Sequence, residues 1–267
     1  TRLLSSSSGQ GLLHESAKVR ARGRDLLGAE CGPPDDQSFD LHEIARRTET
    51  SLAHVLAAST AIFCHRLTGE QDLMVGLPVS ARNGSTRRVP GMVSNVLPLR
   101  LSLRASMAVS DVIHQASSEI RESLKHQRYQ IVDLRRDIGR TGDTRALFGV
   151  SANIMRFDYD LDFAGHRAIA HNLSLGPVDD LSIAFYAHSR DRLRIDFDAN
   201  PAFHSADNVA DRQKRFLTLL TSLTPDAPVG TLEIVSAAER RRLLEEWKAT
   251  ARAVPTGSLG EVLAAQA

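Results

Sequence analysis

Apolar and polar residues alternate through the stretch PGMVSNVLPLRL, residues 90–101, which predicts a half-buried strand over about 92–103. One parity of this stretch carries four aliphatic side chains, Val93, Leu97, Leu99 and Leu101. Asn95 lies on the same apolar parity. Because an unpaired buried carboxamide costs about 1–3 kcal/mol, we expect Asn95 to have hydrogen-bond partners.

Periodicity also predicts the other elements of the chain. Apolar side chains at helical spacing, together with capping residues, predict helices over 39–47, 50–69, 107–127, 131–138 and 205–223. Short apolar runs predict strands over 72–79 and 147–155, and alternation within 180–200 predicts a hairpin with its bend at 189–191. Helices interspersed with strands predict a mixed α/β domain.

The two ends of the chain lack the regular hydrophobic pattern of its middle. Residues 1–37 hold a serine run, a basic stretch and the turn-rich CGPPDD, and are predicted to be irregular. After residue 224, prolines interrupt the pattern, and Ser236 and Glu239 have the spacing of a capping box that begins a short helix. We therefore divide the chain into an irregular segment, a domain and a linker, at 1–37, 38–224 and 225–267.

Composition argues against several classes of function. The 267 residues carry 33 Lys and Arg against 32 Asp and Glu, so no net charge attracts nucleic acid or acidic lipid. No apolar run approaches the ~20 residues that span a membrane, and the first residues lack the apolar core of a secretion signal. Cys31 and Cys64 have neither disulfide nor zinc spacing, which favours a reducing, cytoplasmic location. The chain does not begin with Met, so we expect it to be a piece of a longer protein.

No self-contained catalytic constellation occurs in the sequence. It lacks a GxxxxGK[ST] phosphate loop, a GxSxG nucleophile elbow, and the CxxC and HExxH patterns of metal sites. Its 10 histidines never form adjacent pairs, and none has an Asp four residues later. Single histidines such as His54, His114, His126 and His204 are interpreted as surface, core or capping residues. The residues alone therefore predict no catalytic group and no metal site.

Several segments are similar to motifs that occur in a single family in the same order and with similar spacing. VPGMVSNVLPLRL at 89–101 contains Gly and then Asn-x-Leu-Pro-Leu-Arg. HQRYQIVDLRRDIG at 126–139 is similar to His-Gln-x-Tyr-Pro-Phe-x-x-Leu, with Gln and Ile in place of Pro and Phe. RALFGVSANIM at 145–155 is similar to an Arg-x-x-Leu-Phe segment that ends in a carboxamide, here Asn153. Two further matches are LTGEQDLMVGLPVSAR at 67–82 and TLEIVSAAERRRLLEEWKATA at 231–251. Together they resemble the C-terminal lobe of a nonribosomal peptide synthetase condensation domain, with the start of its linker to an adenylation domain.

The resemblance implies a fold and an activity. The fold is α/β, of the α+β type: one lobe of a two-lobed chloramphenicol-acetyltransferase-like structure, with a mixed sheet and flanking helices. The family forms an amide between a donor acyl group and an acceptor amine, each held as a thioester on the phosphopantetheine arm of a carrier protein, with no cofactor bound directly. Its catalytic His-His-x-x-x-Asp-Gly motif belongs to the N-terminal lobe and is absent from this chain. We therefore expect the chain to be inactive alone.

The implied partners are the missing N-terminal lobe, the donor and acceptor peptidyl carrier proteins and a downstream adenylation domain, with neither nucleic acid nor membrane among them. The resemblance places Asn95 near the lobe interface, on the acceptor side of a substrate tunnel. The alternative is that its carboxamide satisfies backbone groups at a strand end beside Pro98. The other candidates for acceptor-side contact are Ser182, Asn153 and Ser94.

Two other functions stay open from the sequence. One is a stand-alone acyltransferase of the same superfold, against which the linker-like residues 225–267 argue. The other is a non-catalytic module that docks carrier proteins. The irregular stretch 156–177 is expected to cross over to the other lobe, and its unpaired backbone would then favour self-association of the isolated chain.

Overall fold

The computed structural model describes residues 41–140 except 83, 85, 87, 89 and 92, together with residues 147–155, 161–168, 178–189, 192–247 and 258–264. The chain divides into two compact units, Thr1–Ile234 and Val235–Ala267. The irregular segment predicted at 1–37 lies outside the described residues, as do the last two residues of the bend predicted at 189–191.

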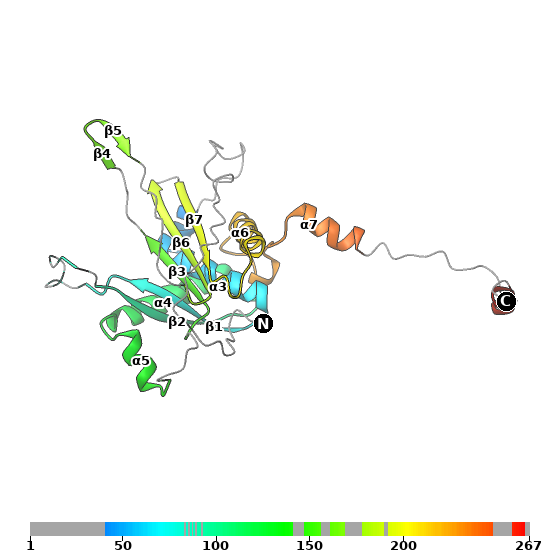
Figure 1. Cartoon of the computed structure of the whole chain (residues 1–267), viewed down its shortest axis with the longest axis horizontal. Helices are drawn as coiled ribbons and strands as arrows, with labels where there is room; N and C mark the ends of the chain where they lie inside the picture. Colours follow the sequence, from blue (N-terminus) through cyan, green and yellow to red (C-terminus); the bar gives the residue numbers. More distant parts are fainter. Residues whose placement is uncertain are drawn as a thin grey trace. The chain divides into compact units, whose positions relative to one another are not determined.

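A mixed sheet of five strands forms the centre of the first unit (Figure 1). In spatial order the strands are β2 (Asn95–Ser102), β1 (Asp72–Val79), β3 (Val150–Met155), β6 (Leu181–Ser189) and β7 (Arg192–Ala199). The outer pairs, β1 with β2 and β6 with β7, are antiparallel, whereas β3 is parallel to both of its neighbours. The predicted strands and hairpin are thus present, and the α/β fold with a mixed sheet is confirmed.

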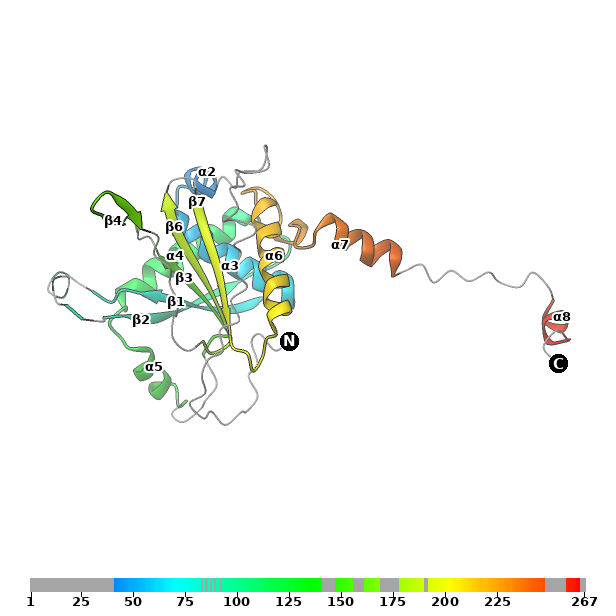
Figure 2. The ribbon, with the colours of Figure 1, turned by 45° about the horizontal axis from the view of Figure 1, so that its top comes forward.

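Helices pack against the face of the sheet that carries the leucines of β2 (Figure 2). They are α3 (Leu52–Thr68), α4 (Val109–Lys125) and α6 (Ala206–Thr221), with the short α2 (Leu41–Arg47) packed on α3. Phe216 of α6 lies at the centre of this core. Its ring centroid is 5.1 Å from that of Phe63 on α3, 5.7 Å from Phe197 and 5.9 Å from Phe185. The rings join two helices and the β6–β7 hairpin into one apolar layer.

The predicted end of helix α3 is confirmed. Gly69 follows the last helical residue with φ of 76°, and its N–H donates to the carbonyl of His65 at 2.8 Å. This left-handed conformation carries little steric cost for glycine, which therefore commonly ends helices.

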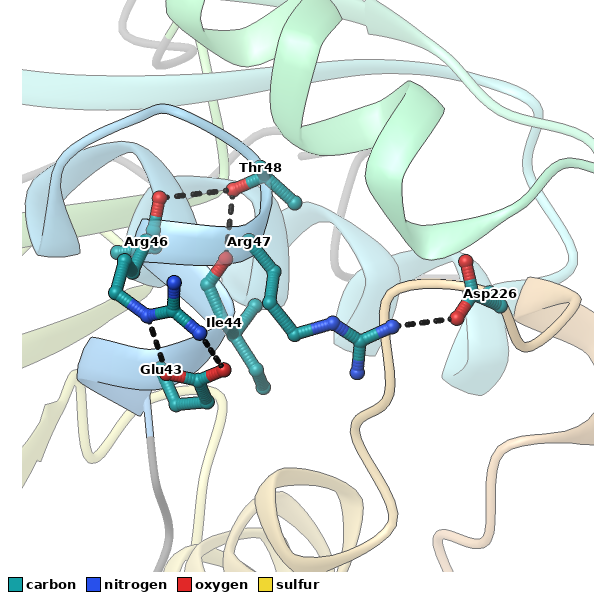
Figure 3. Close-up of polar contacts among 7 residues, drawn as sticks. Glu43, Ile44, Arg46, Arg47, Thr48 and Asp226 are labelled. Atoms are coloured by element: carbon teal, nitrogen blue, oxygen red, sulfur yellow. Dashed lines mark hydrogen bonds and ion pairs between the residues drawn. The ribbon is translucent and has the colours of Figure 1, made fainter.

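Residues 225–234, the first part of the predicted linker, pack on the first unit. Four of their residues are buried: Pro225, Val229, Leu232 and Ile234. The N–H of Val229 donates to the carbonyl of Met107 at 2.8 Å. Arg47 of α2 also pairs with Asp226, with 2.6 Å between Nη2 and Oδ2 (Figure 3). The compact unit therefore extends to Ile234.

The second unit contains α7 (Ala237–Arg241), which continues as the π-helical turn η2 (Arg242–Glu246), and α8 (Leu259–Ala264). The hydroxyl of Ser236 accepts a hydrogen bond from the N–H of Glu239 at 3.1 Å. Ser236 is thus the N-cap that the sequence predicts.

A small hairpin lies within the stretch predicted to be irregular, 156–177. Strands β4 (Leu161–Phe163) and β5 (His166–Ala168) pair antiparallel through a turn in which Ala164 has φ of 53° and Gly165 has φ of 84°. Two consecutive positive φ angles are the signature of a type I′ hairpin turn, and the Asp162 carboxylate accepts from the N–H of Gly165 at 2.7 Å. Alternation over only three residues per strand was too short to predict it. The rest of the stretch lies outside the described residues.

Candidate functional site

Asn95 is the first residue of β2, and its carboxamide is engaged entirely with backbone. Nδ2 donates to the carbonyls of Gln127 at 3.0 Å and Tyr129 at 2.7 Å, and Oδ1 accepts from the N–H of Ile131 at 3.1 Å. The residue is 5% exposed and shares the parity of the buried leucines of β2. Both donors of the carboxamide are thereby used, which meets the expectation that Asn95 has partners. These partners are backbone groups of a connection more than 30 residues further along the chain, and not groups at the strand end beside Pro98.

The connection that Asn95 contacts joins α4 to α5 (Ile131–Asp137), the predicted short helix. Helix α5 has no fully buried residue, and the strand of the sheet that it contacts is β2 (Figures 1 and 2). The hydroxyl of Tyr129 donates to the carboxylate of Asp137, and this hydrogen bond raises the pKa of the tyrosine. One connection therefore touches both ends of α5.

The other three candidates lie on the opposite parity, which we call the second face of the sheet: Ser94 before β2, Asn153 on β3 and Ser182 on β6. Ser182 is 8% exposed, whereas Asn153 is half-buried and Ser94 is exposed. Ser182 is the register partner of Ser151 on β3, so Asn153 lies on the neighbouring strand one step further along the same face. The structure thus brings Asn153 and Ser182 to one region and places Asn95 on the face beneath the helices.

The second face also carries charge on β7. Asp198 is the register partner of Ser182, and Asp196 pairs with Arg194 at 2.5 Å. This ion pair raises the pKa of the Arg194 guanidinium, which lies 5.0 Å from the ring centroid of Tyr186. The Ser182 hydroxyl on β6 therefore borders a carboxylate-bearing strand, with the Asn153 carboxamide one strand further away, an arrangement suited to hydrogen bonding with amide and amine groups.

A buried polar cluster that the sequence did not predict lies where β6 begins and α6 begins. Both ring nitrogens of His204 have a hydrogen-bond partner. Nε2 contacts the carboxylate of Asp180, and Nδ1 lies 2.7 Å from Nη1 of Arg212. Because arginine only donates, Nδ1 accepts and Nε2 carries the proton toward Asp180. Burial lowers the pKa of Arg212 and, together with the charge of Asp180, raises the pKa of the Cys64 thiol to about 12.

The His204 imidazole is 4% exposed and both its nitrogens are occupied, so it ties the two elements together. His204 precedes the predicted helix, but no spacing in the sequence pointed to Asp180 or Arg212. Within the described residues, no group of three His, Cys, Asp or Glu side chains is arranged to hold a metal ion. None of the helices in that part of the chain combines the length and apolarity needed to cross a bilayer.

Fold and site together define an α/β domain with a mixed sheet, a polar second face and, among the described residues, no metal cluster. The sequence matches the condensation domain family over residues 28–244. It is 42% identical over 239 residues to a dimodular nonribosomal peptide synthase of Bacillus subtilis (strain 168), a match that covers 88% of this chain and 10% of that protein.

The solved structures that resemble the chain include two condensation domains. A mutant starter condensation domain of rhizomide synthetase, in complex with C8-CoA, superimposes with a TM-score of 0.67 at 40% identity, over 73% of this chain and 46% of that one. The first condensation domain of the calcium-dependent antibiotic synthetase, in complex with a substrate analogue, gives a TM-score of 0.70 at 32% identity, over 75% of this chain and 45% of that one. This chain belongs to the condensation domain family, and it spans less than half of these two solved chains.

Proposed function

We propose that this chain is the C-terminal lobe of an amide-forming condensation domain in a nonribosomal peptide synthetase. The observation that carries the proposal is the extent of the match: the family match covers residues 28–244, while the chain covers only 46% of the rhizomide domain and 45% of the calcium-dependent antibiotic domain. A single lobe of a two-lobed domain fits both figures. The general base then comes from the other lobe, since this sequence has no adjacent histidines.

The reaction joins a donor acyl thioester to an acceptor amine, with both substrates presented on phosphopantetheine arms of peptidyl carrier proteins in the cytoplasm. The work of such a domain is positioning, because holding a carbonyl and an amine in attack geometry supplies much of the rate enhancement. The residues beyond Ile234 serve as the start of a linker toward an adenylation domain, which agrees with their separation into a second unit.

For the acceptor side we propose the second face of the sheet, with Ser182 and Asn153 as its hydrogen-bonding groups and Ser94 at its margin. Support comes from their shared parity and from the burial of the Ser182 hydroxyl. Removing either central group is expected to raise the KM for the acceptor. Ser182→Ala and Asn153→Ala are to be compared with Ser110→Ala, a hydroxyl on α4.

The activity itself is tested with the complete product of the gene that encodes this chain. Donor and acceptor thioesters on carrier proteins are incubated with it, and amide products are followed by mass spectrometry. We expect product from the complete protein and none above the buffer rate from the 267-residue chain. Product from the chain alone would support a stand-alone acyltransferase. Carrier binding without turnover by either protein would support a docking module, and both results contradict the proposal.

A further inference from the structure

Helix α5 lacks the usual sources of helix stability. It spans seven residues, Ile131–Asp137, and buries none of them. Isolated helices shorter than about 12 residues are marginal in water. Its N-cap residue, Gln130, makes no side-chain capping hydrogen bond. Ile131 and Leu134 are only half-buried, so neither full apolar burial nor a local cap explains why α5 begins where it does.

The missing cap comes from another element. The N–H of Ile131, the first residue of α5, belongs to the group of helix donors that have no partner within the helix. It donates to Oδ1 of Asn95 at 3.1 Å. The Nδ2 group of Asn95 holds the carbonyls of Gln127 and Tyr129, so the backbone is fixed on both sides of Gln130.

Asn95 is well placed for this task. It is 5% exposed, it begins a strand whose next three residues of the same parity are buried leucines, and it is the register partner of Val79 on β1. The connection in turn holds the far end of α5, because the hydroxyl of Tyr129 donates to the carboxylate of Asp137. The edge strand β2 thus holds, through Asn95, a helix that buries no residue fully.

We propose that Asn95 is a positioning residue: its carboxamide caps α5 from strand β2 and holds the α4–α5 connection in the conformation that the condensation domain uses. It acts through the connection and does not contact substrate. The capping part of this inference stands on geometry alone, whereas the part that concerns turnover rests on the proposed function.

Amide hydrogen exchange on the 267-residue chain tests the cap. We expect Asn95→Ala to speed exchange of the Ile131 amide and of the first turn of α5 by up to about tenfold, the worth of one buried hydrogen bond. Gln213→Ala is the matched control. Gln213 is 4% exposed and its Nε2 donates to the Ile195 carbonyl at 3.0 Å, but it lies on α6. Unchanged exchange at Ile131 in Asn95→Ala, or equal acceleration in the control, would overturn the cap.

A rescue separates capping from other roles of Asn95. Gln130 has the extended backbone of an N-cap, with φ of −67° and ψ of 141°, so Gln130→Asp supplies a local cap. Adding it to Asn95→Ala is expected to restore part of the protection of α5. In the complete gene product, the same double variant is expected to recover part of the kcat/KM that Asn95→Ala loses.

The outcomes distinguish the two proposals. Recovered protection without recovered kcat/KM would show that Asn95 acts on the reaction by another route, and would overturn the positioning role. An unsubstituted gene product without condensation activity would contradict the proposed function, while the exchange data would still decide whether Asn95 caps α5.

Discussion

Replacing Gly76 by alanine tests why a glycine stands in the middle of β1. A Cβ built at this position lies 2.3 Å from Cε2, 2.5 Å from Cδ2 and 2.7 Å from Cζ of Phe148. The ring therefore occupies the space of the missing side chain, on the second face of the sheet. A glycine inside a strand often marks such a close approach.

The expected cost follows from two opposing effects. Ordinary carbon contacts begin near 3.4 Å, so the Phe148 ring must move by roughly 1 Å or swing toward solvent. Overpacking of this kind costs about 1–3 kcal/mol. Replacing a strand glycine by alanine recovers about 0.5–1 kcal/mol of backbone entropy. We expect Gly76→Ala to lower the free energy of unfolding by about 1–2 kcal/mol in net terms.

A double-mutant cycle with Phe148→Ala isolates the ring. Without the ring, Gly76→Ala is expected to raise the free energy of unfolding by about 0.5 kcal/mol, so the coupling between the two sites is about 1.5–2.5 kcal/mol. Urea unfolding is followed by far-UV circular dichroism, because Trp247, the one tryptophan, lies in the second unit. Equal costs of Gly76→Ala in both backgrounds would refute the steric explanation.

Three further predictions concern the core and the buried cluster. Phe216→Ala, which removes the central ring of the aromatic core, is expected to cost about 3–5 kcal/mol in urea unfolding, and a cost below 1 kcal/mol would contradict that role. His204→Ala removes the hydrogen-bond partner of two half-buried charged groups, Asp180 and Arg212, and is expected to cost about 1–3 kcal/mol, against little change for the exposed His42→Ala. Burial raises the pKa of Cys64 to about 12, so in a Cys31→Ser background the native thiol is expected to resist alkylation at pH 8 and to react once urea unfolds the chain. Rapid native labelling would show that this thiol is exposed.

The periodicity of apolar residues was sufficient to predict most of the helices and strands. The alternation around Asn95 predicted β2, and helical spacing predicted α4 and α6, because each of these elements buries one apolar face. Helix α3 was predicted from its apolar residues and its Gly69 stop, and it buries every residue from Val55 to His65. The β4–β5 hairpin was missed because each strand has only three residues, and its turn depends on the positive φ of Ala164.

The hydrogen-bond partners of the polar residues could not be predicted from the sequence, for a different reason. Parity placed Asn95 among buried leucines and required partners, but those partners are backbone groups at 127–131, brought close only by the packing of α4 on β2. The His204 cluster likewise joins Asp180 and Arg212 from separate elements. The residue spacing within one segment does not indicate which residues of other elements it will hydrogen-bond.

Reading the gene upstream of the codon for Thr1 tests whether this chain is one lobe of a condensation domain whose catalytic histidines lie elsewhere. We expect an open reading frame, continuous with this chain, that encodes His-His-x-x-x-Asp-Gly. A start codon immediately before Thr1, with no such motif in a partner gene beside it, would contradict the one-lobe assignment.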